Sequence, residues 1–260
     1  MIPFGIIGYV PPSGRFNSDA FRRNVASWKT KHRLILFSDG DWPGLERIPN
    51  PEIFRNRHHY SVNNAVFLIG LHIALAAGME FFLYIESDCR VRGHEWDQAI
   101  WSDFNQWKGI VAYGSPVIYN QSQNGHNNLK RSTEMAWDYQ SATGLAMPQY
   151  GAWPGAGKDI CLYPNGALGV YHTKTMASFF PNSQNDLKRE LAGIMAWDVS
   201  IGQGLWRSFG AEVFDRVGFS RVTYSGCGDS LVGQDERGAM LATGKKVAIH
   251  QWKGEEDFST

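Results

Sequence analysis

One stretch of the sequence, Phe81-Phe82-Leu83-Tyr84-Ile85-Glu86-Ser87-Asp88, passes from apolar residues directly to an acidic triplet. A short apolar run that ends at polar residues is typical of a buried β-strand, predicted here over residues 81–85. In an open α/β sheet, the carboxyl ends of the strands border the ligand crevice. The stretch therefore predicts a strand that delivers two carboxylates, those of Glu86 and Asp88, to a binding site.

The segments before this strand alternate between strand-like and helix-like patterns. Short apolar runs predict strands over residues 4–10 and 33–38, and helical spacing predicts a helix over residues 19–28. A strongly apolar helix is predicted to begin at Asn63 or Asn64 and to end near Ala77. Strand–helix–strand order indicates a parallel sheet. The predicted fold class is therefore α/β, with a Rossmann-like, mostly parallel central sheet flanked by helices.

The later part of the chain continues the pattern without a repeat or a linker, so residues 1–260 are expected to form a single domain. Gly, Asn and aromatic residues without periodicity over residues 120–158 predict a long functional loop. Cys89-Arg90-Val91 suits a short exposed strand. The remaining predicted strands are 110–119, 166–171, 213–222 and 246–250, and one or two helices are expected within residues 186–209.

Composition excludes several classes of protein. Twenty-five basic and 25 acidic residues give no net charge, so no overall field draws the chain to nucleic acid or to an anionic membrane. Three widely spaced cysteines form no disulfide scaffold and suit a reducing compartment. No signal peptide and no apolar run of spanning length is recognised, so a cytoplasmic location is expected. Walker, serine-hydrolase and zincin motifs do not occur.

The spacing of Glu86 and Asp88 suits a hard divalent cation. Two carboxylates at positions i and i+2 past a strand end can address one ion, and Mn²⁺ and Mg²⁺ prefer such oxygen ligands and commonly bridge to substrate phosphates. The alternative is a solvated acidic turn that merely ends the strand, because Glu-x-Asp is a common pattern.

The context of the triplet resembles the GT-A glycosyltransferases, whose D-x-D motif holds a divalent metal on the diphosphate of a nucleotide sugar. An apolar helix that ends in Ala76-Ala77-Gly78 precedes a hydrophobic strand and then the triplet, in which Glu86 stands for the first Asp. Two later stretches are similar to the same superfamily in the same order. Residues 165–171 resemble its glycine-containing strand, and residues 197–202 resemble the helix start that presents an acidic residue to the acceptor.

The resemblance implies roles for particular residues. Glu86, Asp88 and His250 would hold Mn²⁺ or Mg²⁺, and Asp198 would be the catalytic base. His250 could instead be a locally bonded strand-end histidine, and Asp198 lacks the acidic neighbour that inverting members often carry, since Trp197 precedes it. The residues implied in binding the nucleotide-sugar donor are Tyr9, Val10, Asp39, Arg57, Glu86, Ser87, Asp88 and Lys253. Asp39 could equally cap the turn of residues 39–41, and Arg57 could belong to a solvated basic loop.

The predicted function is that of a metal-dependent hexosyltransferase that moves a sugar from a nucleoside-diphosphate sugar to an acceptor hydroxyl, with inversion favoured. Residues of about 1–118 would form the nucleotide-sugar-binding half, and residues of about 119–260 the acceptor-binding half, for a glycan or another hydroxyl compound. One alternative is a nucleotidyltransferase or sugar-nucleotide pyrophosphorylase, although residues 11–15 make a poor version of its Gly-rich basic loop. Another is a catalytically inactive glycosyltransferase-like binding module.

Overall fold

The computed structural model describes the backbone in eleven segments. These are residues 4–9, 18–38, 46–49, 59–87, 89–120, 160–180, 197–209, 212, 215–220, 222–225 and 247–250. Some side chains within these segments, including those of Asp198 and His250, lie outside the description. The predicted loop over residues 120–158 lies outside it as well, apart from Asn120.

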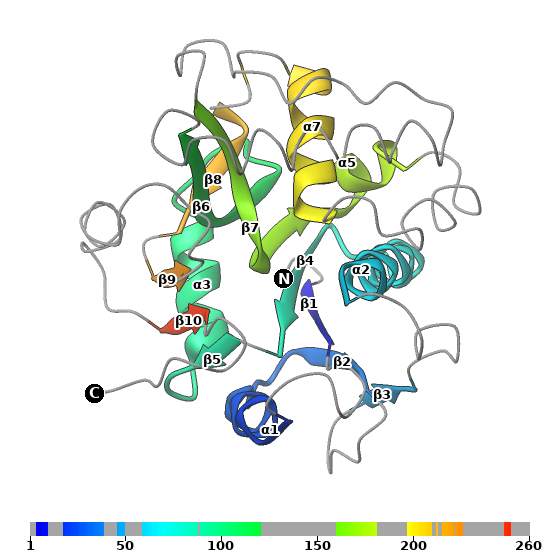
Figure 1. Ribbon diagram of the computed structural model, residues 1–260, viewed down its shortest axis with the longest axis vertical. Coiled ribbons are helices and arrows are strands. Elements are labelled where there is room, and N and C mark those ends of the chain that lie inside the picture. The colour runs from blue at the N-terminus through cyan, green and yellow to red at the C-terminus, as the bar shows by residue number, and fades with distance from the viewer. Residues whose placement is uncertain are drawn as a thin grey trace.

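The described elements alternate strands and helices along the first half of the chain (Figure 1). The strands are β1 (Phe4–Tyr9), β2 (Arg33–Phe37), β3 (Glu46–Ile48), β4 (Phe81–Glu86), β5 (Cys89–Val91), β6 (Ala112–Asn120), β7 (Ile160–His172), β8 (Val217–Phe219), β9 (Thr223–Ser225) and β10 (Ala248–His250). The helices are α1 (Ser18–Ser27), α2 (His59–Ala76), α3 (Trp96–Phe104), α5 (Thr173–Ser178) and α7 (Trp197–Phe209).

Seven strands form one sheet in the order β3-β2-β1-β4-β7-β6-β8. Strands β3, β2, β1 and β4 are parallel, β6 and β8 are parallel to each other, and β7 runs antiparallel to both of its neighbours. A second sheet has the order β5-β10-β9. The predicted α/β class with a mostly parallel, Rossmann-like sheet is thus confirmed. Because β2 and β4 lie on opposite sides of β1, the strand order reverses between β1 and β4, which is a topological switch point.

The two faces of the sheet carry separate hydrophobic cores, because successive strand residues point to opposite faces. Ile7 of β1 and Tyr84 of β4 lie in the core that includes side chains of α2, α5 and α7. Ile6 and Ile85 lie in the core that includes side chains of α1 and α3. Figure 1 shows the same division, with α2 and α7 on one side of the central strands and α1 and α3 on the other.

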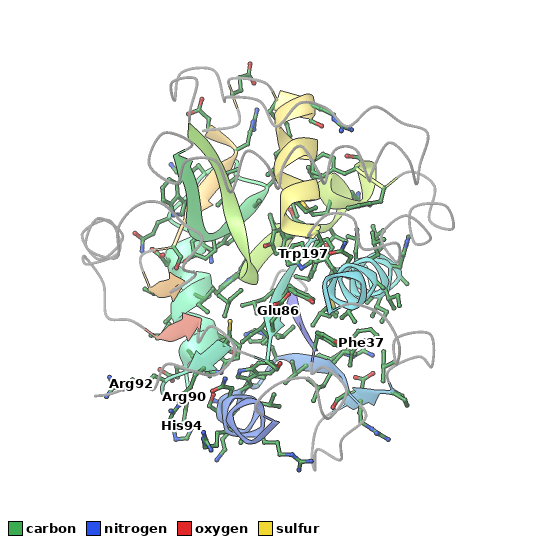
Figure 2. All side chains as sticks on the ribbon, in the orientation of Figure 1. Phe37, Glu86, Arg90, Arg92, His94 and Trp197 are labelled. Carbon is green, nitrogen blue, oxygen red and sulfur yellow. The ribbon has the colours of Figure 1, made fainter. Side chains whose placement is uncertain are left out.

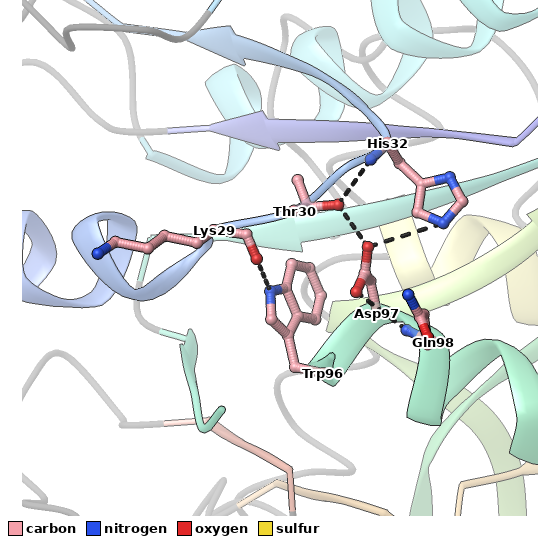
Figure 3. Close-up of polar contacts among 6 residues, drawn as sticks. All are labelled: Lys29, Thr30, His32, Trp96, Asp97 and Gln98. Atoms are coloured by element: carbon pink, nitrogen blue, oxygen red, sulfur yellow. Dashed lines mark hydrogen bonds and ion pairs between the residues drawn. The ribbon is translucent and has the colours of Figure 1, made fainter. Parts of the chain in front are cut away.

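Helix α3 is fastened to the connection between α1 and β2 by polar contacts (Figure 3). The indole nitrogen of Trp96 donates to the Lys29 carbonyl at 3.0 Å. The buried carboxylate of Asp97 accepts a hydrogen bond from the Thr30 hydroxyl and lies 3.7 Å from Nε2 of His32. These contacts hold α3 against the core that also contains Trp28 of the same connection.

Several sequence-based boundaries differ from the structure. Helix α2 begins at His59, so the predicted start at Asn63 or Asn64 is wrong. Asn64 lies inside the helix and is 1% exposed. The residues before it are mostly polar, so the first turn of the helix shows no apolar periodicity in the sequence. Strand β5 forms as predicted, but Cys89 and Val91 are buried, so it is not an exposed strand. Strand β3 and helices α3 and α5 were not predicted.

The later elements follow the predictions more loosely. Strand β7 begins six residues before the predicted strand, at Ile160. Within the strand predicted over residues 213–222, the structure shows the three-residue strand β8. Strand β9 follows it and belongs to the second sheet. Within the part of the chain that the structure describes, no helix combines the length and hydropathy that crossing a bilayer requires.

We predict that His172 makes the stability of the fold depend on pH. Its Nδ1 accepts a hydrogen bond from the Thr175 backbone N–H at 3.3 Å and so caps α5. Burial lowers the pKa of His172 below its ordinary value of 6.5, an effect that the Glu80 carboxylate opposes and the Lys174 ammonium reinforces. The unfolded chain therefore takes up this proton first as the pH falls, so stability is full above the unfolded pKa and declines below it.

The prediction is tested by measuring the Tm of the wild type and of variants between about pH 7.5 and about pH 5.5, the range in which histidine titrates. We expect His172→Gln to give a shallower fall in Tm than the wild type, because glutamine keeps an acceptor and does not titrate. His72→Gln, at an exposed histidine of α2, is the matched control and should keep the wild-type slope. Equal slopes for His172→Gln and the wild type would contradict the prediction.

Candidate functional site

The carboxyl ends of three parallel strands lie in one row. Tyr9 pairs with Phe37 of β2 on one side and with Glu86 of β4 on the other. Figure 2 shows Phe37 and Glu86 on the strands that flank β1. Because ligands of open α/β sheets bind outside such strand ends at the switch point, this row is the candidate site.

Glu86 points to the face of the sheet that α7 covers. It has the same parity along β4 as Phe82 and Tyr84, whose side chains lie in the core shared with α2 and α7. The indole Nε1 of Trp197, the first residue of α7, donates to Oε1 of Glu86 at 3.3 Å (Figure 2). This bond joins positions 111 residues apart in sequence and links the end of β4 to the start of α7.

Trp197 is held by aromatic packing on several sides. Its ring stacks on Phe67 of α2, with centroids 4.1 Å apart and planes inclined by 12°. Tyr84 and Tyr171 meet it edge-on at 4.9 and 5.5 Å. The side chain is 3% exposed, so the first turn of α7 has a defined position against the sheet. Asp198, the predicted base, is the second residue of that helix, and its backbone therefore lies next to the residue that contacts Glu86.

The acidic triplet is also held from the other face of the sheet. The Asn24 amide nitrogen donates to the Ser87 carbonyl at 2.9 Å, and the Trp28 indole donates to the Cys89 carbonyl at 2.9 Å. Asn24, Trp28 and Ser87 are all buried. Two hydrogen bonds from the α1 side thus fix the backbone on either side of Asp88.

The second sheet brings His250 to the same turn. In the antiparallel register of β10 with β5, His250 pairs with Cys89, the residue that follows Asp88. The pairing concerns the backbone, since the His250 side chain lies outside the description. Among the side chains that the structure describes, no three His, Cys, Asp or Glu residues gather as a metal site.

The residues at this turn nonetheless fit a hard divalent cation. Glu86 supplies a carboxylate at the strand end, Asp88 is two residues further on, and the strand register adds a histidine position beside them. Mn²⁺ and Mg²⁺ prefer carboxylate oxygens, and a neutral imidazole in the set suits Mn²⁺ better than Mg²⁺. The assignment of Glu86, Asp88 and His250 as metal ligands stays a prediction.

The other predicted site residues are distributed as follows. Tyr9 is 2% exposed, and its ring belongs to the core beside α2, so its part in the site is its position at the end of β1. Ser87 is buried in the turn after β4. Val10, Asp39, Arg57, Asp88 and Lys253 lie outside the described residues.

Two residues that position the site were not predicted for that role. From the sequence, Trp197 is named only as the residue before Asp198. A tryptophan directly before a candidate catalytic residue at a helix start does indicate that the helix start is packed against the core. Asn24 offered no such signal, because an asparagine within a predicted amphipathic helix is ordinarily solvated. Its contact with Ser87 spans 63 residues of sequence and is visible only in the fold.

No protein-family model and no curated protein matches the chain. The galactosyltransferase LgtC, solved with donor and acceptor sugar analogs, is similar to it with a TM-score of 0.46 and 15% identity, over 95% of this chain and 86% of that chain. Mouse xyloside xylosyltransferase 1 in its apo form is similar with a TM-score of 0.45 and 10% identity, over 95% and 97%.

A third solved structure is described as mannose-1-phosphate geranyltransferase from Thermus thermophilus. Its TM-score is 0.40 and its identity 16%, over 78% of this chain and 68% of that chain. Two of these three proteins are glycosyltransferases.

We predict that the indole of Trp197 stabilises the fold mainly through its packing. Trp197→Phe keeps a ring against Phe67 but removes the donor to Glu86 and part of the buried ring system, so we expect a loss of about 1–3 kcal/mol in the free energy of unfolding. Trp197→Ala also removes the buried ring, and a loss of about 3–5 kcal/mol is expected. Urea unfolding followed by circular dichroism measures both, and equal losses for the two variants would contradict the described packing.

Proposed function

We propose that the chain is a metal-dependent glycosyltransferase that moves a hexosyl group from a nucleoside-diphosphate sugar to an acceptor hydroxyl. The observation that carries the proposal is the convergence of three separate chain segments on the switch point. Glu86 ends β4 there, Trp197 ties it to the start of α7 beside Asp198, and β10 aligns His250 with the turn after Asp88.

The donor would lie across the row of strand ends. Asp39 follows β2 by two residues and Val10 follows β1 directly, so both are candidates for contacts with the base and ribose. At the β4 end, Glu86, Asp88 and His250 would hold Mn²⁺ or Mg²⁺ on the diphosphate, and Arg57 and Lys253 would offset further phosphate charge. When bound, the metal supplies Lewis-acid stabilisation of the leaving nucleoside diphosphate.

The proposed chemistry of this chain's own residues is proton transfer at Asp198. The acceptor hydroxyl oxygen attacks the anomeric carbon, its proton passes to the Asp198 carboxylate, and the bond from the anomeric carbon to the diphosphate oxygen breaks with the electron pair leaving on the diphosphate. Attack from the side opposite the leaving group inverts the anomeric centre. A retaining reaction would instead use Asp198 to orient the sugar or to stabilise its developing positive charge.

Two rivals remain distinguishable by their products. A nucleotidyltransferase or sugar-nucleotide pyrophosphorylase would join a nucleotide to a sugar phosphate and release pyrophosphate. A catalytically inactive glycosyltransferase-like module would bind the donor without turnover. The proposal expects instead a free nucleoside diphosphate and a transferred sugar.

The first test of this proposed function concerns donor binding. In calorimetric titrations of UDP-, GDP-, dTDP- and CMP-sugars, we expect one donor to bind with Mn²⁺ and to bind at least about tenfold more weakly with EDTA, a difference of about 1.4 kcal/mol. Asp88→Asn and Glu86→Gln should remove the metal dependence. Asp215→Asn and Glu95→Gln, at exposed carboxylates elsewhere, are the matched controls and should retain it. Metal-independent binding by the wild type would contradict the metal assignment.

The second prediction concerns Asp198. Transfer of the donor sugar to water needs no identified acceptor, so donor hydrolysis is the readout, with the anomer of the released sugar followed by NMR. We expect Asp198→Asn to keep the donor affinity of the wild type and to slow hydrolysis by about 10²- to 10⁴-fold, because the general base is lost. Loss of donor affinity in this variant would place Asp198 on the donor side instead. Glu212→Gln, at an exposed carboxylate after α7, is the control.

A further inference from the structure

A second candidate site lies between α1 and β5. A cavity of about 440 Å³ is lined there by Arg23, Ala26 and Ser27 of α1 and by Arg90, Arg92 and Gly93 in and after β5. We call it the arginine pocket. Figure 2 shows Arg90 and Arg92 beside α1, away from Glu86 and Trp197.

The spacing of the residues explains why three arginines meet there. Arg90 and Arg92 are two apart and share one side of the β5 backbone, while Cys89 and Val91 are buried on the other side. Arg23 lies three and four residues before Ala26 and Ser27, so these residues share one face of α1. The small side chain of Ala26 leaves space between the two elements.

The walls of the arginine pocket are fastened by specific hydrogen bonds. The Ser27 hydroxyl accepts from the Val91 N–H at 3.2 Å, and the Trp28 indole donates to the Cys89 carbonyl at 2.9 Å. The Arg92 N–H donates to the Val247 carbonyl at 2.7 Å, which ties this wall to the segment before β10. The position of the arginine backbones is therefore set by the fold.

The turn at the mouth of the arginine pocket requires a glycine. Gly93 has φ of +86°, in the left-handed region that residues with a Cβ rarely adopt. Apart from its two chain neighbours, no described residue places an atom within 4 Å of where a Cβ would be, so the space beside this turn is open.

Two of the three arginines carry charge that no carboxylate neutralises in the described part of the chain. Arg23 and Arg92 are exposed, and no described acidic side chain pairs with either. The contrast within the same protein is Arg33, which holds Glu46 through two hydrogen bonds of 2.7 and 2.8 Å. No described carboxylate holds the guanidinium groups of Arg23 and Arg92 as Glu46 holds Arg33, so their N–H donors can bind an anion.

We propose that the arginine pocket binds a phosphate-bearing anion with more than one negative charge. A guanidinium donates a fork of two hydrogen bonds that matches phosphate geometry, and several such groups around one cavity suit an anion with several oxygens. The cavity has room for a diphosphate-sized group. The site is separate from the row of strand ends and does not rest on the proposed glycosyl transfer.

The test is calorimetric titration of the whole chain with inorganic pyrophosphate in the presence of EDTA, which keeps the proposed metal-dependent donor site silent. We expect binding that weakens with added salt, because exposed charges are screened. The double variant Arg23→Gln/Arg92→Gln should weaken it at least about tenfold. The matched control Arg22→Gln/Arg207→Gln removes the same charge at exposed arginines outside the pocket and should leave affinity within about twofold.

A site-resolved readout separates this pocket from binding elsewhere. Pyrophosphate should shift the backbone amide signals of Ser27, Arg92 and Gly93 in ¹⁵N–¹H spectra. Sedimentation with vesicles of phosphatidic acid and phosphatidylcholine distinguishes the source of the phosphate. Binding to vesicles that the double variant loses would indicate a lipid headgroup, and binding to pyrophosphate alone would indicate a soluble ligand.

Three outcomes would overturn the proposal. These are no binding of either probe, equal weakening in the double variant and its control, and amide shifts confined to residues outside the pocket. Circular dichroism and Tm establish that the variants are folded. Arg92→Lys provides a milder test, because it keeps the charge, removes the fork and should weaken pyrophosphate binding by less than the double variant does.

Discussion

The parallel pairing of β1 with β4 is the constraint on which the rest of the structure depends. It places Tyr9 and Glu86 side by side, and because β2 lies on the other side of β1, the chain leaves the two strand ends in opposite directions. A crevice at such a point is a consequence of topology rather than of any single side chain. The candidate site lies at this switch point between β1 and β4.

The surroundings of this pairing hold the acidic triplet from both faces of the sheet. On one face, Trp197 contacts Glu86 and is itself stacked on Phe67. On the other, Asn24 and Trp28 bind the carbonyls of Ser87 and Cys89. A carboxylate that must meet a charged ligand needs a defined position before the ligand arrives, because ordering it afterwards would cost binding free energy. These contacts supply that preorganisation on the described side of the site.

The same attachment of α1 to β5 serves two features. The hydrogen bonds that Asn24 and Trp28 donate to the carbonyls of Ser87 and Cys89 position the backbone on either side of Asp88. The hydrogen bonds of Ser27 and Trp28 to β5 position the wall of the arginine pocket. Arg90 is only two residues from Asp88 along the chain. An anion in the pocket and a ligand at the strand ends would therefore both lie close in sequence to the short segment from Asp88 to Arg92.

The sequence by itself determined the α/β class and placed the ends of β1, β2 and β4 at residues 10, 38 and 85, each within one residue of the end that the structure shows, because apolar runs that stop at polar residues record burial locally. It also singled out Asp198 and His250, on the strength of a family resemblance. Only the tertiary structure decided that β7 runs antiparallel, that α2 begins at His59, and that Trp197, Asn24 and three arginines have their present neighbours. The start of α2 escaped prediction because residues 59–63 are mostly polar and carry no apolar periodicity. The physical reason for the rest is that strand pairing and side-chain neighbours are contacts between segments far apart in sequence, and local periodicity carries no information about which distant segment supplies a partner.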